Sequence, residues 1–188
     1  MRRALDSLYR LSGAAAAAFL LAICGVVLLQ VAANMLDSAA VLMVGERIGL
    51  VVPSYSEFTG YFLVAASFLA MANALRAGSH IRVSLLIRGL PRGPRRLIEL
   101  WSTAAGTVLS AFFAWYAIDM VMDSYRFNDV SPGIIAIPIW IPQSSMALGL
   151  VIFVIALADE FATLLRGGTP EYEKGDHGQL TGHVPDDG

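Results

Sequence analysis

Long apolar blocks without charge make up most of this sequence, and the arginines gather in short stretches between them. The strongest basic stretch is residues 76–96, which holds Arg76, Arg82, Arg88, Arg92, Arg95 and Arg96. An apolar block long enough to cross a bilayer flanks it on each side. Because basic residues beside a span are retained on the cytoplasmic side, this stretch is predicted to be a cytoplasmic loop between two membrane helices.

Composition agrees with a multi-spanning membrane protein. Only 15% of the 188 residues are charged and 56% are hydrophobic, whereas soluble domains carry about 25% charged residues. The depletion is local, since charges cluster between apolar blocks. Topology explains the basic loop, so no nucleic-acid partner is predicted. The single cysteine, Cys24, cannot form an intramolecular disulfide.

The apolar blocks predict four transmembrane helices. The first block could be a signal peptide, but signal cores are only about 7–15 residues long, so a retained span is favoured. Residues 37–57 contain apolar pieces too short to cross, and we expect an outer connection there, partly helical at the interface. The predicted spans are residues 11–35, 58–75, 97–122 and 143–165.

The distribution of basic residues predicts the orientation. Of the thirteen lysines and arginines, all except Arg47 and Arg126 fall at the predicted cytoplasmic side. The expected fold is therefore an all-α integral membrane bundle of four transmembrane helices with both termini cytoplasmic. Residues 1–166 form the membrane domain, and residues 167–188 are predicted to be a disordered cytoplasmic tail because they are polar and lack apolar periodicity.

The basic loop has a helical pattern of its own. Val83, Leu86, Ile87 and Leu90 fall on one face of a helix. We expect a short amphipathic helix on the inner membrane surface, with its arginines near lipid phosphates or a partner protein. The glycines and prolines of residues 89–94 are expected to end it.

Few residues in the sequence are suited to catalysis or to binding a cofactor or metal. Of the three histidines, His80 lies in the loop and the other two in the tail, so none is placed to hold haem between helices. No catalytic, cofactor or metal site is predicted, nor an enzyme. Gly106 and Ser110 have the small-xxx-small spacing of a helix contact. This inventory favours a scaffold over a four-helix haem or quinone protein and over an autonomous exporter, which would need a mid-membrane charge.

The sequence resembles the small membrane subunit (DctQ-type) of tripartite ATP-independent periplasmic (TRAP) transporters over roughly residues 11–166. The resemblance rests on Glu57 before the second span, on the loop A-L-R-A-G-S-H-I-R-V-S-L-L-I-R-G-L-P, and on I-P-I-W-I-P at residues 137–142 with Gly149 beyond. In the loop the matching residues include Arg76, Gly78, His80 and Arg82. Ser84 departs from the acidic residue that the family often has there.

The resemblance implies a subunit of the bacterial inner membrane in a three-part importer. A periplasmic binding protein would capture an organic acid, and a large permease subunit would carry it with a sodium gradient. The small subunit would pack beside the large one among membrane lipids and steady its scaffold. From its length of 188 residues we expect the unfused form. The candidate motif and interface residues are Glu57, Arg76, Gly78, His80, Arg82, Gly106 and Ser110.

Overall fold

The computed structural model describes residues 2–46, 48–76 and 92–166. Over these residues the protein is helical, apart from connecting loops and one isolated β-bridge between Val130 and Pro138. The helices are α1 (Arg2–Val44), α2 (Tyr55–Arg76), α4 (Arg92–Phe127) and α5 (Trp140–Leu165). Each of the four is long and apolar enough to cross a membrane, which confirms the predicted fold class.

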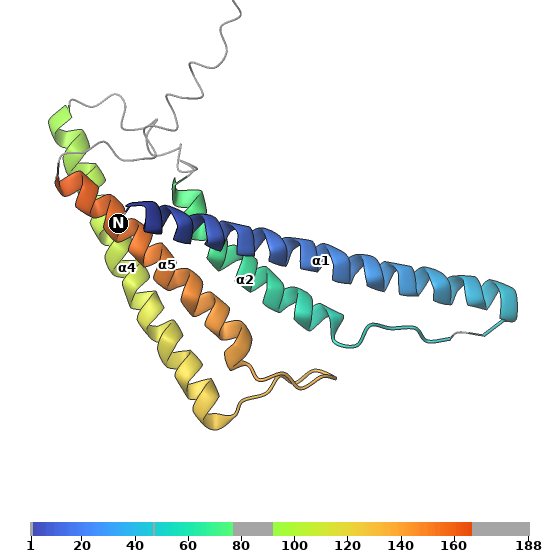
Figure 1. The fold of residues 1–188 in the computed structure, drawn as a ribbon. Coiled ribbons are helices and arrows are strands. Elements are labelled where there is room, and N and C mark those ends of the chain that lie inside the picture. Colours follow the sequence, from blue (N-terminus) through green and yellow to red (C-terminus); the bar gives the residue numbers. More distant parts are fainter. Residues whose placement is uncertain (1, 47, 77–91, 167–188) are drawn as a thin grey trace, which may run out of the picture.

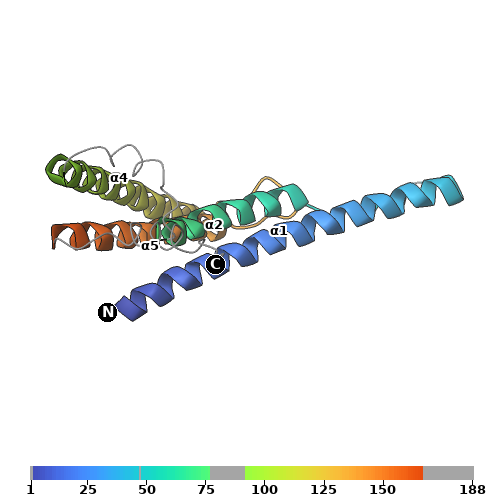
Figure 2. The same cartoon turned by 90° about the horizontal axis from the view of Figure 1, so that it is seen from above.

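The four helices lie in a row, in the order α1, α2, α5, α4 (Figure 1, Figure 2). α2 packs between α1 and α5, and α5 packs between α2 and α4. We call the end where α1 and α4 begin the terminal end, and the opposite end the loop end. α1 diverges from α4 toward the loop end (Figure 1), and the start of α4, the end of α5 and the start of α1 are spread apart at the terminal end (Figure 2). The row is open, so α1 and α4 each expose many large apolar side chains.

Two apolar cores hold the row together. The larger joins α1, α2 and α5, and the smaller joins α4 to α5. Alanine is frequent in both, which allows helix axes to approach closely where membrane helices have no hydrophobic force to join them. The larger core comprises Tyr9, Ala16, Leu69, Ala72, Leu75, Ile152, Ala156 and Leu157, and the smaller comprises Ala114, Ala117, Ala147 and Leu150.

α1 is longer than the predicted first span. It has 43 residues and so measures about 64 Å, roughly twice the 30 Å hydrocarbon thickness of a bilayer. It must therefore tilt strongly or extend beyond the hydrocarbon. Residues 37–44, expected in the outer connection, continue the helix because this segment has no glycine or proline before Gly45, where φ is +80°.

The other spans begin or end close to the predicted bounds. α2 and α5 each start three residues before the prediction, and α4 extends five residues further at each end. Pro94 and Pro142 lie in the first turns of α4 and α5, where proline is tolerated because the missing N–H has no helical partner.

The amphipathic helix predicted around residues 83–90 and the tail over residues 167–188 lie outside the described residues. The cytoplasmic placement of both termini stays a prediction.

Candidate functional site

A polar cluster ties α1 to α2 at the terminal end. The Arg76 guanidinium, at the end of α2, forms an ion pair with the carboxylate of Asp6. The same guanidinium lies over the ring of Tyr9, with its central carbon 4.8 Å from the ring centroid, an arrangement that adds cation–π attraction. Only 18% of the Arg76 side chain is exposed. We call Asp6, Tyr9 and Arg76 the terminal cluster.

Two acidic residues of α5 lie near the terminal cluster. Asp159 and Glu160 are close enough to act electrostatically on Tyr9, and Glu160 is buried. The Tyr9 ring is the largest fully buried side chain, and its hydroxyl has no hydrogen-bond partner among the described residues. Three helices, α1, α2 and α5, therefore bring polar groups together at the terminal end.

A second polar contact ties α2 to the loop between α4 and α5. The Ser131 hydroxyl, almost fully buried, lies 3.3 Å from Glu57 Oε2 and 3.2 Å from the carbonyl oxygen of Ile135. The Ile135 N–H donates to Ser54 Oγ at 3.1 Å. A side chain on Gly133 would collide with the Glu57 carboxylate. We call Ser54, Glu57, Ser131 and Gly133 the loop clasp.

The loop clasp depends on a folded α4–α5 loop. The Ser131 N–H donates to the Ile137 carbonyl at 2.8 Å, and the Ile139 N–H donates to the Asp129 carbonyl at 3.0 Å. These bonds form a short antiparallel turn that carries Ser131 toward α2. Glu57 was predicted just before the second span; because α2 begins at Tyr55, it lies in the first turn of the helix, where an acidic side chain complements the helix dipole.

We expect Gly133→Ala to open the loop clasp. The added methyl group would displace the Glu57 carboxylate and remove its contact with Ser131, worth about 1 kcal/mol for a typical hydrogen bond. Amide hydrogen exchange at Ser131 and Ile139 should then accelerate by about fivefold, because local opening costs less.

Gly60→Ala is the matched control, since Gly60 lies one turn from Glu57 and nothing stands within 4 Å of its added Cβ. Exchange at Ser131 should be unchanged in this variant. Equal exchange in Gly133→Ala and in the unaltered protein would contradict the loop clasp.

Helices approach closely at two glycines. A Cβ built on Gly149 of α5 would stand 2.6 Å from the backbone carbonyl carbon of Phe68 in α2, and one on Gly13 of α1 would stand 2.8 Å from the Asn73 side chain. The predicted contact residue Gly106 is less crowded, because its added Cβ would be 4.0 Å from Leu157. Ser145 and Gly149 have the same small-xxx-small spacing as Gly106 and Ser110, so this signal was available in the sequence.

The connection between α1 and α2 runs back along α1. The Gln30 side chain accepts a hydrogen bond from the Val52 N–H at 2.9 Å and donates to Asn34 at 3.0 Å. The Asp37 carboxylate accepts from the Gly49 N–H at 2.8 Å. This connection is therefore held against α1 by the polar side chains of Gln30, Asn34 and Asp37.

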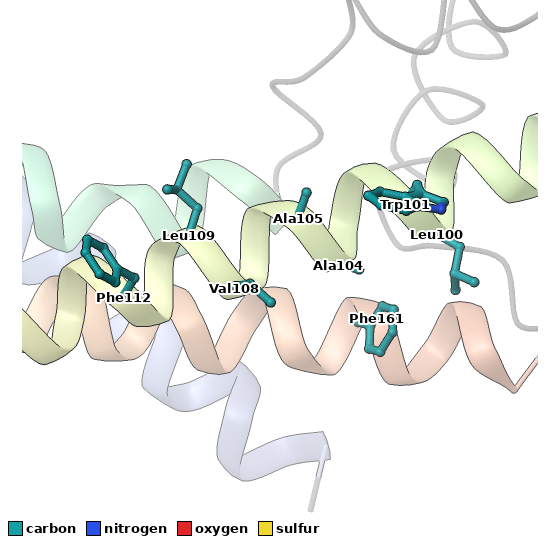
Figure 3. Close-up of a pocket in the computed structure, with 8 residues that line it drawn as sticks. All are labelled: Leu100, Trp101, Ala104, Ala105, Val108, Leu109, Phe112 and Phe161. Atoms are coloured by element: carbon teal, nitrogen blue, oxygen red, sulfur yellow. The ribbon is translucent and has the colours of Figure 1, made fainter.

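An apolar groove opens between α4 and α5 near the terminal end (Figure 3). Leu100, Ala104 and Val108 of α4 face Phe161 of α5, and Trp101 lies at the rim. The groove is open along one side and has a volume of about 820 Å³. Almost all of its surface is apolar, so it offers no group for acid–base or metal chemistry.

The predicted candidate residues lie in separate parts of the row. Glu57 belongs to the loop clasp and Arg76 to the terminal cluster, at opposite ends of α2. Gly106 and Ser110 are half-buried on α4. Among residues 2–46, 48–76 and 92–166, no three His, Cys, Asp or Glu side chains gather as a metal site. Gly78, His80 and Arg82 lie outside the described residues.

Residues 47–167 match the sequence profile of the DctQ component of tripartite ATP-independent periplasmic transporters, which covers more than half of the chain. The chain belongs to this family. It is a small permease component of a TRAP transporter and a multi-pass protein of the inner membrane. The family is one of transporter subunits and not of enzymes.

A curated relative supports the same assignment. The chain is 26% identical over 98 residues to the ectoine TRAP transporter small permease protein TeaB of Halomonas elongata. The match covers 50% of this chain and 51% of TeaB, so the chain spans about half the length of that relative. The family match begins after α1, which leaves Asp6 and Tyr9 outside it and Arg76 inside it.

Proposed function

We propose that this chain is the scaffold subunit of a sodium-driven importer of organic acids. It packs beside a large permease subunit that carries the solute, and a periplasmic binding protein delivers the solute to the complex. The ectoine in the name of TeaB belongs to the same broad class of small organic solutes. The terminal end lies in the cytoplasm and the loop end in the periplasm, in line with the distribution of basic residues.

The observation that carries this proposal is the position of the buried charge. In the described part of the chain, the buried charged residue Glu160 and the ion pair of Asp6 with Arg76 lie near the terminal end. The middle of each described span has no charged side chain, and its polar groups are mainly hydroxyls such as those of Thr107 and Ser110. A transport path needs polar groups at depth, because an unsolvated ion in hydrocarbon is costly. These helices are thus suited to support a neighbouring subunit.

One exposed face of α1 is suited to receive the large subunit. Ala14, Ala17, Ala18 and Gly25 are all exposed, and nothing lies within 4 Å of a Cβ added to Gly25. Small residues let a second helix approach closely. Ala16, from the same alanine run, is buried in the core of this chain instead. The alternative face around Gly106 and Ser110 on α4 is partly used against α5.

Uptake by reconstituted proteins tests the proposed function. Proteoliposomes with this subunit and its large permease, a sodium gradient and the binding protein should accumulate a labelled organic acid. Vesicles with this subunit alone should show only background uptake. Ala18→Trp should reduce co-purification of the large subunit by tenfold or more, because the indole would separate helices that pack through small residues.

The matched control is Ala111→Trp, which places the same side chain at an exposed site on α4. It should leave the complex intact. If Ala111→Trp releases the permease and Ala18→Trp does not, the interface is on α4. Uptake by this subunit alone at the rate of the full complex would overturn the scaffold function. Uptake of the zwitterion ectoine but of no anionic organic acid would correct only the substrate class.

A further inference from the structure

α1 extends well past the helix against which it packs. α2 has 22 residues and so measures about 33 Å, enough for one crossing of the bilayer. Asp6 of α1 meets Arg76 at the end of α2, and Gln30 meets Val52 just before α2 begins. Residues 31–44 of α1 therefore project beyond the start of α2 (Figure 1). We call residues 31–44 the α1 tip.

The α1 tip has a polar side and an apolar side. Asp37 and the neighbouring Gln30 hold the connection between α1 and α2 on the polar side, and helical spacing places Ala39 on the opposite side. Four large apolar side chains flank Ala39 there, with exposed fractions of 68% for Met35, 61% for Leu36, 88% for Leu42 and 87% for Met43. The connection lies on the side of α1 toward the α4–α5 loop (Figure 1), so the apolar side faces away from the surface at the loop end.

An upright α1 would leave these apolar side chains in water. From Leu11 to Met43 the helix rises about 50 Å, and Asp37 is the one charged residue in that run. Because the hydrocarbon is about 30 Å thick, a perpendicular helix that enters it at Leu11 would leave it near Gln30. A tilt of about 45° fits the whole run into roughly 36 Å, the hydrocarbon plus one headgroup layer. Such a tilt lies just beyond the usual range of about 0–40°.

The connection is bonded in the way that a segment needs where water is scarce. The N–H groups of Gly49 and Val52 donate to side chains of α1 at 2.8 and 2.9 Å, and the Gly45 N–H donates to the Val41 carbonyl at 3.0 Å. Within a membrane, backbone polar groups must find partners inside the protein. These bonds allow the connection to lie at the membrane interface together with the α1 tip.

We propose that α1 crosses the membrane obliquely and that the α1 tip rests in the lipid leaflet at the loop end. The Ala39 side contacts acyl chains, and the polar side carries the connection toward the headgroups. Amphipathic helices bind the interface in this way, with the apolar face buried about 5–10 Å into the headgroup and acyl boundary. Asp37 and the exposed Glu46 then lie at headgroup depth, where their charges stay solvated. The lipid contact is separate from the small-residue face around Ala18.

Spin-label accessibility in proteoliposomes tests the lipid contact. Cys24→Ser removes the native thiol, and a nitroxide is attached to a new cysteine at Leu28, Ala39, Met43 or Asn128. Oxygen concentrates in hydrocarbon, whereas a nickel chelate stays in water. The ratio of oxygen to nickel collision rates should be several-fold higher at Ala39 and Met43 than at Asn128 in the exposed α4–α5 loop. Leu28 provides the value for a site within the hydrocarbon.

Ser38→Cys is the matched control, because Ser38 is exposed one position from Ala39 but lies nearer the polar side. Its ratio should be lower than that at Ala39, while helical content stays constant in every variant. A ratio at Met43 equal to that at Asn128 would place the α1 tip in water and overturn the proposal. The labels are also measured in the complex with the large permease. Loss of both collision rates at Ala39 there would show a protein contact in place of lipid and would equally overturn it.

Discussion

Gly149→Ala is expected to destabilise the protein more than any other single methyl group added to the described helices. The new Cβ would stand 2.6 Å from the backbone carbonyl carbon of Phe68 and 2.7 Å from its Cβ. Backbone cannot rotate aside as a flexible side chain can, so α5 must move away from α2. Overpacking of this kind costs about 1–3 kcal/mol, and larger residues at position 149 should cost more.

The consequence extends beyond one contact because the central pair of the row shares the larger core. Leu69 and Ala72 of α2 pack there with Ile152 and Ala156 of α5, within two turns of the crossing. A displacement at Gly149 therefore loosens apolar packing on which α1 also depends. The thermal unfolding midpoint in detergent, followed by tryptophan fluorescence, should fall by several degrees for Gly149→Ala.

Gly25→Ala provides the control for helix propensity. It makes the same chemical change in the middle of α1, where nothing lies within 4 Å of the added Cβ. Alanine is favoured over glycine in a helix by about 0.8–1 kcal/mol, so this variant should be neutral or slightly more stable. Equal midpoints for Gly149→Ala and Gly25→Ala would show that α2 and α5 do not meet closely at this glycine.

Hydropathy predicted the spans well because each is bounded by features that the sequence shows directly. Charged residues bracket α2, with Glu57 in its first turn and Arg76 at its end. Pro142 marks the start of α5 within two residues. The extended ends of α1 could not be predicted in the same way, because the charges at its start and Asp37 near its end are compatible with a helix that leaves the hydrocarbon.

Hydropathy and flanking charges do not tell which helices pack against one another in the row. α5 is apolar on most of its circumference, so periodicity does not tell which side faces α2. The small-residue spacing occurs at Gly106 and Ser110 and again at Ser145 and Gly149, and only the packed structure shows that Gly149 has the closer contact. The spacing of small residues identifies candidate sites of close helix packing, and the three-dimensional structure shows which of these sites is used.

The polar contacts were the hardest to foresee. Glu57 and Arg76 were identified as candidates through the family resemblance, without their contacts. Glu57 meets Ser131 across 74 positions of sequence and Arg76 meets Asp6 across 70. No local rule connects residues so far apart. Asp6 is a single acid among Arg2, Arg3 and Arg10, and that isolation is the one sequence signal that points to it.

Removal of Asp6 is expected to have the second large effect. Asp6→Asn keeps the shape of the side chain but leaves the Arg76 guanidinium, only 18% exposed, without its carboxylate. Breaking a fully buried ion pair costs about 3–5 kcal/mol. Asp6 is 42% exposed, and solvent screens part of the interaction, so about 1–2 kcal/mol is expected here.

A double-mutant cycle isolates the ion pair from the other contacts of Arg76. Arg76→Gln also loses the stacking over the Tyr9 ring, so its effect should exceed that of Asp6→Asn. The two effects should not add, and a coupling of about 1 kcal/mol is expected for residues in direct contact. Unfolding in detergent at low and high salt provides the measurement.

Asp119→Asn, at an exposed site on α4, serves as the control and should change stability by less than about 0.5 kcal/mol. Additive effects of the Asp6 and Arg76 variants would show that the pair contributes nothing to stability.

If the two effects couple, α1 is held to α2 by charge at one end and by close packing of Gly13 against Asn73 further along. Since α2 is also fixed to α5 at Gly149, the terminal cluster then anchors the outermost helix to the rigid centre of the row. A scaffold subunit needs such an anchor if its exposed α1 face is to support a moving neighbour.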